Sequence, residues 1–221
     1  DIATLSQPEE ILISSSKIDI SCNGLSDGSI DVSVSGGILP YLFDWVGPSG
    51  NAGNTEDISG LGAGAYDLTI TDGNDCVMPF PTVETIIEPL AATATYVSQV
   101  DVLCNGNASG SIEIDVAGGI TPYVFDWTNA SGSSVSDIED PEDLPAGAYS
   151  LTITDGNACE FSFANLATIT EPPLLTADLG KTDITCFGDG NGSITVTPSG
   201  GTAPYEYSMD GSSYQSSTIF T

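Results

Sequence analysis

Residues 22–45 read CNGLSDGSIDVSVSGGILPYLFDW, and this stretch returns twice further along the chain. Residues 104–127 read CNGNASGSIEIDVAGGITPYVFDW, and residues 186–209 read CFGDGNGSITVTPSGGTAPYEYSM. The cysteines that open the three copies are equally spaced along the chain. A fixed period of about 82 residues predicts a tandem array of small domains, and such arrays serve reach, display and adhesion more often than chemistry.

A second recurring segment marks the end of each copy. It reads IATLSQP at residues 2–8, VETIIEP at residues 83–89 and LATITEP at residues 166–172. We therefore expect a segment of a longer protein, divided into the last strand of a preceding repeat (1–8), two complete immunoglobulin-like repeats (9–89 and 90–172) and an incomplete one (173–221).

The composition excludes several classes of partner. The chain has 31 acidic residues against two basic ones and no histidine, for a formal net charge of −29. Nucleic acids and anionic lipid surfaces are bound through clustered Lys and Arg, so neither is an expected partner. No apolar run approaches the ~18 residues of a membrane span, so direct membrane insertion is not expected either. Hydrophobic residues still make up 40% of the chain, which suffices for packed cores.

Alternating apolar residues predict short strands. The segments SIDVSVS (29–35) and YLFDW (41–45) each place every second residue on one face, and AYDLTIT (65–71) does the same. About seven such strands in each period of ~82 residues predict an all-β fold of tandem immunoglobulin-like antiparallel β-sandwich repeats.

Two local signals recur beside these strands. Asp72-Gly73 and Asp155-Gly156 are typical of hairpin turns. Tyr66 and Tyr149 follow an Ala-Gly-Ala tripeptide at the start of a strand, as in the tyrosine corner of immunoglobulin-like folds. We therefore expect both tyrosines to be buried, with each hydroxyl bonded to backbone just upstream.

The five cysteines follow the repeat. The interval from Cys22 to Cys76 nearly equals the interval from Cys104 to Cys159, and Cys186 stands alone. The matched spacing predicts disulfides Cys22–Cys76 and Cys104–Cys159 within the repeats, and hence an oxidising compartment. A Cys76–Cys104 link between repeats, and buried free thiols in a cytosolic protein, are the alternatives.

These motifs together resemble the SprB repeat. The resemblance rests on C-x-G-x(3,4)-G-S-I, then GG-x-x-P-Y, then L-x-AG-x-Y-x-L-T-I-T-D-x-x-x-C, and it covers essentially the whole chain. The family is named for a large surface adhesin of gliding bacteria. The resemblance implies a giant secreted protein at the cell surface, often exported by the type IX route and made mostly of such repeats.

Candidate sites are few. Without histidine the chain cannot build a Ser-His-Asp or Cys-His centre, and no carboxylate pair sits in a recognisable motif, so we expect no enzyme. No cofactor is expected, although calcium is possible because oxygen ligands crowd the loops. The calcium candidates are Asp27, Asp72, Asn74, Asp155, Asn157, Asp189 and Asn191. Hairpin-turn chemistry explains the same residues and is the favoured interpretation.

The aromatic rows admit two interpretations as well. Tyr41-Phe43-Trp45 and Tyr123-Phe125-Trp127 fill a sandwich core or form sugar-stacking platforms, and the core interpretation is favoured.

The function expected from the sequence is structural and adhesive: an extended stalk or filament of a secreted cell-surface protein, with a possible role in gliding motility. The expected partners are extracellular surfaces or polysaccharide, together with neighbouring repeats of the same protein. The alternatives are a carbohydrate-binding module of a secreted protein and a subunit of a self-assembling extracellular filament.

Overall fold

The computed structural model describes residues 7–221, and every regular element among them is a β-strand. The all-β prediction is therefore confirmed. The strand expected at residues 1–8 lies almost wholly outside the described part of the chain. Within residues 7–221 there is no helix of the length and apolarity needed to cross a membrane.

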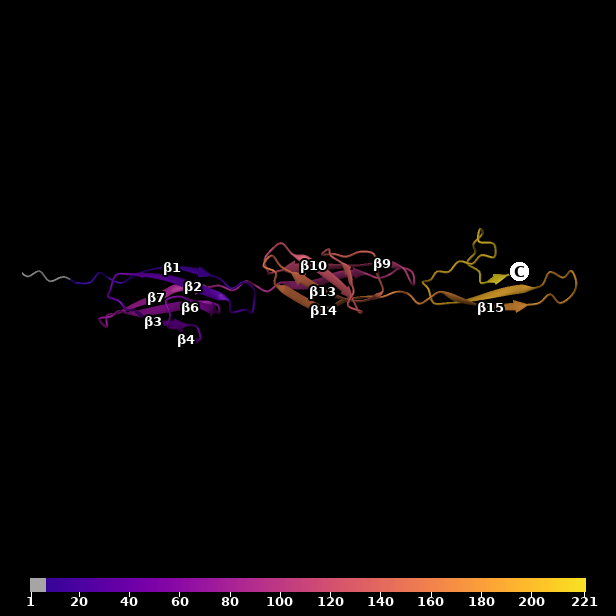
Figure 1. Cartoon of the computed structure of the whole chain (residues 1–221). Coiled ribbons are helices and arrows are strands. Elements are labelled where there is room, and N and C mark those ends of the chain that lie inside the picture. Colours follow the sequence, from indigo (N-terminus) through magenta and orange to yellow (C-terminus); the bar gives the residue numbers. More distant parts are fainter. Residues whose placement is uncertain (1–6) are drawn as a thin grey trace, which may run out of the picture. The chain divides into compact units, whose positions relative to one another are not determined.

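Seven strands form the first repeat and make two antiparallel sheets (Figure 1). One sheet has the order β1-β2-β5 and the other the order β4-β3-β6-β7. The strands are β1 (Leu12–Ile18), β2 (Gly28–Ser35), β3 (Leu42–Gly47), β4 (Gly50–Gly53), β5 (Ile58–Leu61), β6 (Gly64–Thr71) and β7 (Val77–Ile86).

The core of the first repeat lies between these two sheets. Ile30 and Val32 of β2 belong to the same buried cluster as Trp45 of β3 and Leu68 of β6, while Asp31 between the two β2 residues is exposed. Trp45 is fully buried, and its indole N–H donates to the Thr55 carbonyl at 3.0 Å. The two faces of β2 thus follow its alternating sequence, and the two sheets pack as a sandwich around the aromatic side chain.

The second repeat copies this arrangement. Its sheets have the orders β12-β9-β8 and β11-β10-β13-β14. The strands are β8 (Thr93–Val100), β9 (Ala108–Ala117), β10 (Val124–Asn129), β11 (Ser134–Ser136), β12 (Leu144–Pro145), β13 (Gly147–Thr154) and β14 (Glu160–Ile169). Trp127 takes the place of Trp45 and is likewise fully buried, with its N–H on the Ile138 carbonyl at 3.0 Å.

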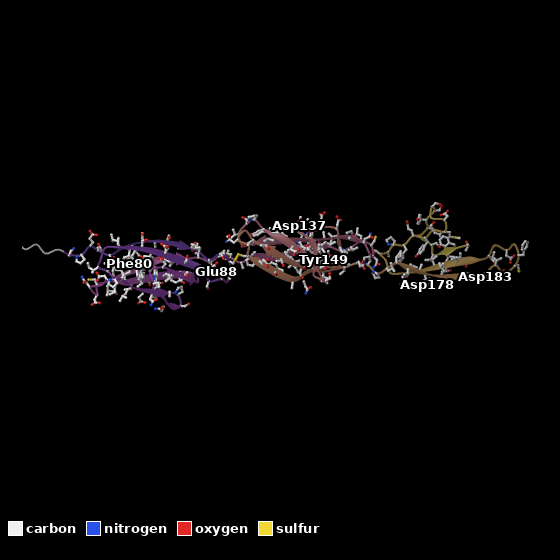
Figure 2. All side chains as sticks on the ribbon, in the orientation of Figure 1. Phe80, Glu88, Asp137, Tyr149, Asp178 and Asp183 are labelled. Carbon is white, nitrogen blue, oxygen red and sulfur yellow. A yellow bond between two sulfur atoms is a disulfide. The ribbon has the colours of Figure 1, made fainter. Side chains whose placement is uncertain are left out.

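Both predicted tyrosine corners are present. The Tyr66 hydroxyl donates to the Gly62 carbonyl at 3.0 Å, and the Tyr149 hydroxyl donates to the Pro145 carbonyl at 2.7 Å. Only 4% of Tyr66 and 1% of Tyr149 are exposed, and Figure 2 shows Tyr149 among the strands of its repeat. Burial raises the pKa of both phenols. Each tyrosine therefore fastens the start of β6 or β13 to the backbone just upstream of that strand.

The third repeat contributes three strands in the order β15-β16-β17. They are β15 (Thr176–Thr182), β16 (Ser193–Ser199) and β17 (Ile219–Phe220). Pro198 pairs with Ala177 near the end of β16, whereas β17 pairs only with Ile194 and Thr195. The proline thus lies where β16 has a neighbour on one side alone, as its missing N–H requires.

By its contacts the described chain divides into two compact units. The first comprises the chain up to Thr93 together with Val116–Tyr123 and Ile153–Phe161. The second comprises Ala94–Asp115, Val124–Thr152 and Ser162–Thr221. The first unit therefore contains two turns of the second repeat besides the whole first sandwich. The predicted repeat bounds and the immunoglobulin-like topology stay predictions. We continue to call residues 9–89, 90–172 and 173–221 the first, second and third repeat.

Candidate functional site

The region richest in repeated motifs is the junction between the first two repeats, all of which lies in the first unit. We call it the joint. It consists of the Cys22 loop (residues 19–27), the linker at residues 87–92, and the two turns Val116–Tyr123 and Ile153–Phe161.

The Cys22 loop is held to the end of its own repeat. The Asn23 side-chain amide donates to the Pro89 carbonyl at 3.0 Å, and the Gly24 N–H donates to the Glu88 carboxylate. Figure 2 shows Glu88 at this end of the first repeat. The Asp27 carboxylate accepts from the hydroxyl and the N–H of Ser21, and these bonds lower the pKa of Asp27. The loop that carries Cys22 is thus fixed on both sides.

The second repeat repeats these bonds. The Asn105 amide donates to the Pro172 carbonyl at 3.1 Å, and the Gly106 N–H donates to Glu171 at 2.7 Å. The Cys-Asn-Gly motif and the Glu-Pro motif are therefore two halves of one contact. Sequence reasoning did not assign a role to Glu88 or Glu171. The signal was available, because both motifs recur with the same step.

A double glycine receives the incoming linker. The Gly119 N–H donates to the Leu90 carbonyl at 2.8 Å, and a Cβ on Gly118 would stand 2.1 Å from the Ala91 carbonyl oxygen. Gly118 also has a φ of +75°, a value that L side chains rarely adopt. The same close approach occurs between Gly36 and Glu10 and between Gly200 and Leu174.

An aspartate organises the turn that presents Cys159. The Asp155 carboxylate accepts from the N–H groups of Cys159 and Asn157 at 3.0 and 2.9 Å, and from the Ile120 N–H at 3.0 Å. Burial of Asp155 opposes its ionisation, but these N–H donors outweigh burial and lower its pKa. Asp155 therefore binds the cysteine turn to the double-glycine turn.

The joint is closed by a disulfide between Cys22 and Cys159, with the Cα atoms 5.6 Å apart. Beside it the Asn157 side-chain amide donates to the Ser21 carbonyl at 2.9 Å. Cys76, Cys104 and Cys186 are free and exposed. The predicted pairings Cys22–Cys76 and Cys104–Cys159 are therefore wrong, although two of the four cysteines chosen do form a disulfide. The bond crosses the boundary between repeats.

Strand geometry explains why Cys22 cannot reach Cys76. Cys76 directly precedes β7, whereas the Cys22 loop is bonded to Glu88 and Pro89 just beyond the end of that strand. Ten residues of β-strand span about 30 Å, while bridged Cα atoms lie within about 7 Å. The two cysteines of one repeat therefore lie at opposite ends of the sandwich, and Cys22 lies at the end that meets the second repeat.

Several of the calcium candidates accept hydrogen bonds within their turns. Asp72 accepts from the Asn74 and Cys76 N–H groups at 2.8 and 3.0 Å. Asp189 accepts from the Thr185 hydroxyl at 3.0 Å, and Asn191 accepts from the Thr185 N–H at 3.1 Å. In residues 7–221 no three His, Cys, Asp or Glu side chains gather as metal ligands would. These contacts support the turn interpretation, and calcium stays an untested prediction.

The aromatic rows belong largely to the cores. Trp45 and Trp127 are fully buried, and the rings of Tyr41 and Phe43 meet edge to face with centroids 6.4 Å apart. Leu42, between the two rings, is 68% exposed, as alternation predicted. A sugar-stacking platform needs open ring faces, and the tryptophans offer none.

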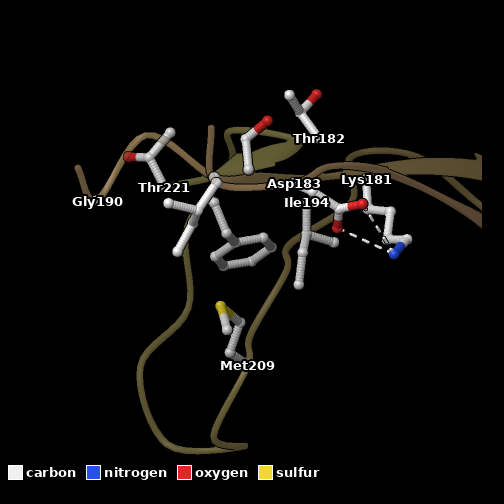
Figure 3. A pocket seen from close by; sticks show the side chains of 11 residues that line it. Lys181, Thr182, Asp183, Gly190, Ile194, Met209 and Thr221 are labelled. Carbon is white, nitrogen blue, oxygen red and sulfur yellow. Dashed lines mark hydrogen bonds and ion pairs between the residues drawn. The ribbon is translucent and has the colours of Figure 1, made fainter. Parts of the chain in front are cut away.

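A hollow of about 490 Å³ lies in the third repeat beside β15 and β16. Figure 3 shows Met209 and Ile194 at its wall, with Lys181 paired to Asp183 at its rim. That ion pair measures 3.0 Å and is largely exposed. Apolar side chains such as Ile184 and Phe220 line the hollow together with polar residues and two glycines.

Fold and joint together define a class: tandem β-sandwich repeats, the first two of which are joined by a disulfide. Three stretches of the chain, residues 14–50, 97–132 and 181–213, match the model of the SprB repeat. The chain thus carries three members of the SprB repeat family, as the motifs predicted. Among curated proteins none matches this chain. SprB repeats are structural rather than enzymatic and occur in cell-surface proteins, so this is a repeat segment of an adhesin-like surface protein.

Proposed function

We propose that the chain is a force-carrying stalk segment of a secreted adhesin, extended or filamentous, which holds a contact with extracellular surfaces or polysaccharide and contributes to adhesion, including adhesion during gliding. The Cys22–Cys159 disulfide is the observation that carries this proposal. The SprB repeats support the surface location.

The disulfide changes how a pull would travel. Tension on the two ends passes along the chain to Cys22, crosses the disulfide and continues from Cys159. The two cysteines are 137 residues apart, and the chain between them then carries none of the tension. Strands β2 to β13 lie within that loop, so they cannot be drawn out while the bond is intact. A tether that must not lengthen under load benefits from this connection.

The charge supports a stalk in a second way. With a net charge of −29 and only two basic residues, neighbouring segments and neighbouring molecules repel one another at low salt. Both lysines are paired with aspartates of their own repeats, Lys17 with Asp19 at 2.9 Å and Lys181 with Asp183 at 3.0 Å. Repulsion of this kind opposes clumping of stalks and weakens as salt rises.

Antibody fragments raised against the chain test the proposal on intact, unpermeabilised cells of the source organism. We expect surface labelling and weaker attachment to glass and to polysaccharide-coated glass. Fragments preabsorbed with the chain are the control. Labelling that needs permeabilisation contradicts a surface stalk, and labelling without any effect on attachment contradicts the adhesive role. Saturable binding of the chain to one defined glycan would favour a carbohydrate-binding module instead.

A further inference from the structure

The three free cysteines occupy the two positions that the disulfide uses. Cys76 stands where Cys159 stands, at the end of the segment ITDGNDC, which becomes ITDGNAC in the second repeat. Cys104 and Cys186 stand where Cys22 stands, one and two periods later. We call the position of Cys76 and Cys159 the late position, and the position of Cys22, Cys104 and Cys186 the early position.

The late position is built in the same way in both repeats. The Cys76 N–H donates to Asp72 at 3.0 Å, and the Cys159 N–H donates to Asp155 at the same distance. Each aspartate N–H in turn donates to the carbonyl of its cysteine at 3.0 Å. The turn around Cys76 therefore already has the form that holds a disulfide in the second repeat.

The early position is also preformed. The carbonyl of each early cysteine accepts an N–H three residues further on at 3.1 Å; the donors are Leu25 for Cys22, Asn107 for Cys104 and Asp189 for Cys186. The turn is thus the same whether or not its cysteine is bonded.

One polar residue beside the late thiol Cys76 recurs beside the closed bond, whereas Asp75 stands in the place of Ala158. Asn74 stands where Asn157 stands, so its amide is placed to reach the backbone carbonyl before a partner cysteine. Cys76 lines a hollow of about 250 Å³ together with Ile11 and Met78. Phe187, next to Cys186, is fully exposed and offers an apolar ring for such a hollow.

We propose that Cys76 is the open late half of a repeat-to-repeat clamp, that Cys104 and Cys186 are open early halves, and that each takes the complementary half of another SprB repeat. For this chain in isolation the partner is a second copy, joined through Cys76 of one molecule and an early cysteine of the other. The inference rests on the closed Cys22–Cys159 bond and does not require the adhesive role.

Closing the clamp is a two-electron oxidation that needs a small disulfide such as oxidised glutathione. One cysteine thiolate attacks the small disulfide, forms a mixed disulfide and releases one small thiol. The second cysteine thiolate then attacks the protein sulfur of the mixed disulfide and releases the other. Two protein thiols become one disulfide, and the two electrons and two protons end on two molecules of glutathione.

In an array in which every joint is closed, tension would follow a covalent path through the disulfides. The path would enter a short segment of chain at one late cysteine, such as Cys159, and leave it at the next early cysteine, Cys186. That segment spans about 90 Å when fully extended, while each clamp carries the path across a repeat boundary. Such an array would hardly lengthen under tension.

Two variants of the full chain test the proposal, and both keep Cys22 and Cys159. Cys104→Ser/Cys186→Ser retains only the late thiol Cys76, and Cys76→Ser/Cys104→Ser retains only the early thiol Cys186. The two are mixed in equal amounts in a glutathione redox buffer, with a mass tag on one. Non-reducing mass spectrometry then counts the disulfide-linked dimers.

We expect the mixed dimer to exceed either homodimer by about tenfold, against about twofold for unselective thiol exchange. Peptide mapping should find Cys76 bonded to Cys186. A mixed dimer at the unselective ratio overturns the proposal, and so does the absence of any protein–protein disulfide. The triple variant Cys76→Ser/Cys104→Ser/Cys186→Ser should stay monomeric under the same conditions.

Discussion

At the scale of single residues, two buried aspartates of this protein act as acceptors for backbone N–H groups of the cysteine turns. Asp72 and Asp155 are the only buried charged or polar residues in the described core, and each accepts from three N–H groups. The N–H of Cys76, followed by those of Asn74 and Ile38, lowers the pKa of Asp72. Ionisation of these carboxyls is therefore coupled to the folded cysteine turns.

The first prediction concerns pH. Because the pKa of Asp155 is lower in the folded chain than the value of about 4 in unfolded chains, its stabilising contribution is present above about pH 4 and is lost as pH falls below it. We expect Asp155→Asn to be less stable than the wild type at pH 7, and the difference in unfolding free energy to narrow at pH 3. Urea denaturation at both pH values measures this, and a difference that does not narrow contradicts it.

The second prediction concerns the tyrosine corner. Tyr149→Phe leaves the Pro145 carbonyl without its donor in a partly buried place, which should cost about 1–3 kcal/mol of unfolding free energy. Tyr96→Phe is the matched control, because Tyr96 is 43% exposed. Chemical denaturation compares the two variants with the wild type. Equal midpoints for all three would show that the hydroxyl bond contributes nothing.

At the scale of elements, the double-glycine turn determines how one repeat enters the next. The linker backbone at Leu90 and Ala91 lies directly on Gly118 and Gly119, where a side chain would clash. The Asp155 carboxylate then bonds the neighbouring Ile120 N–H. Linker, glycine turn and cysteine turn are thus one packed layer at the end of the second sandwich.

The third prediction tests this layer with two alanines. Gly118→Ala and Gly132→Ala both place alanine at a similar φ, +75° and +78°, which costs about 1–2 kcal/mol in either case. Only Gly118→Ala also drives a Cβ to 2.1 Å from the linker, since nothing lies within 4 Å at Gly132. We expect clearly greater destabilisation from Gly118→Ala by thermal unfolding. Equal losses would mean that the linker does not pack on the turn.

Local sequence patterns predicted most of the strands, but they did not predict the Cys22–Cys159 disulfide. Alternation in β2 and β3 and the tripeptide before each tyrosine depend on neighbouring residues, so they can be recognised in the sequence. Cysteine pairing depends on which ends of two sandwiches meet. Because the repeats are equally spaced, Cys22–Cys76 and Cys22–Cys159 each join an early to a late position, and spacing alone cannot separate them.

The Glu-Pro motif at residues 88–89 was used in the sequence only as a mark of the repeat end. Its partner, the Cys-Asn-Gly loop, lies at the other end of the repeat in sequence. A contact between segments that far apart leaves no local periodicity, and the only trace is that both motifs recur together. The same holds for the fit between the double glycine and the linker.

At the scale of the whole molecule, the disulfide changes the protein from separate beads on a chain into covalently coupled repeats. Its sequence separation is 137 residues, and it encloses the larger part of two sandwiches. Reduction breaks this connection, while the hydrogen bonds of the strands do not involve the sulfur atoms. Mechanical behaviour should therefore depend on redox state, even where secondary structure does not.

Pulling single molecules by their ends, oxidised and reduced, measures that coupling directly. Fully unfolded, the oxidised chain should be shorter than the reduced chain by about 480 Å, the length of the 137 residues enclosed by Cys22–Cys159 at about 3.5 Å each. Cys159→Ser should match the reduced chain under both conditions. A difference of about 190 Å would instead reveal the shorter loop of a Cys22–Cys76 bond. Equal lengths for the oxidised and reduced chains would contradict covalent coupling of the repeats.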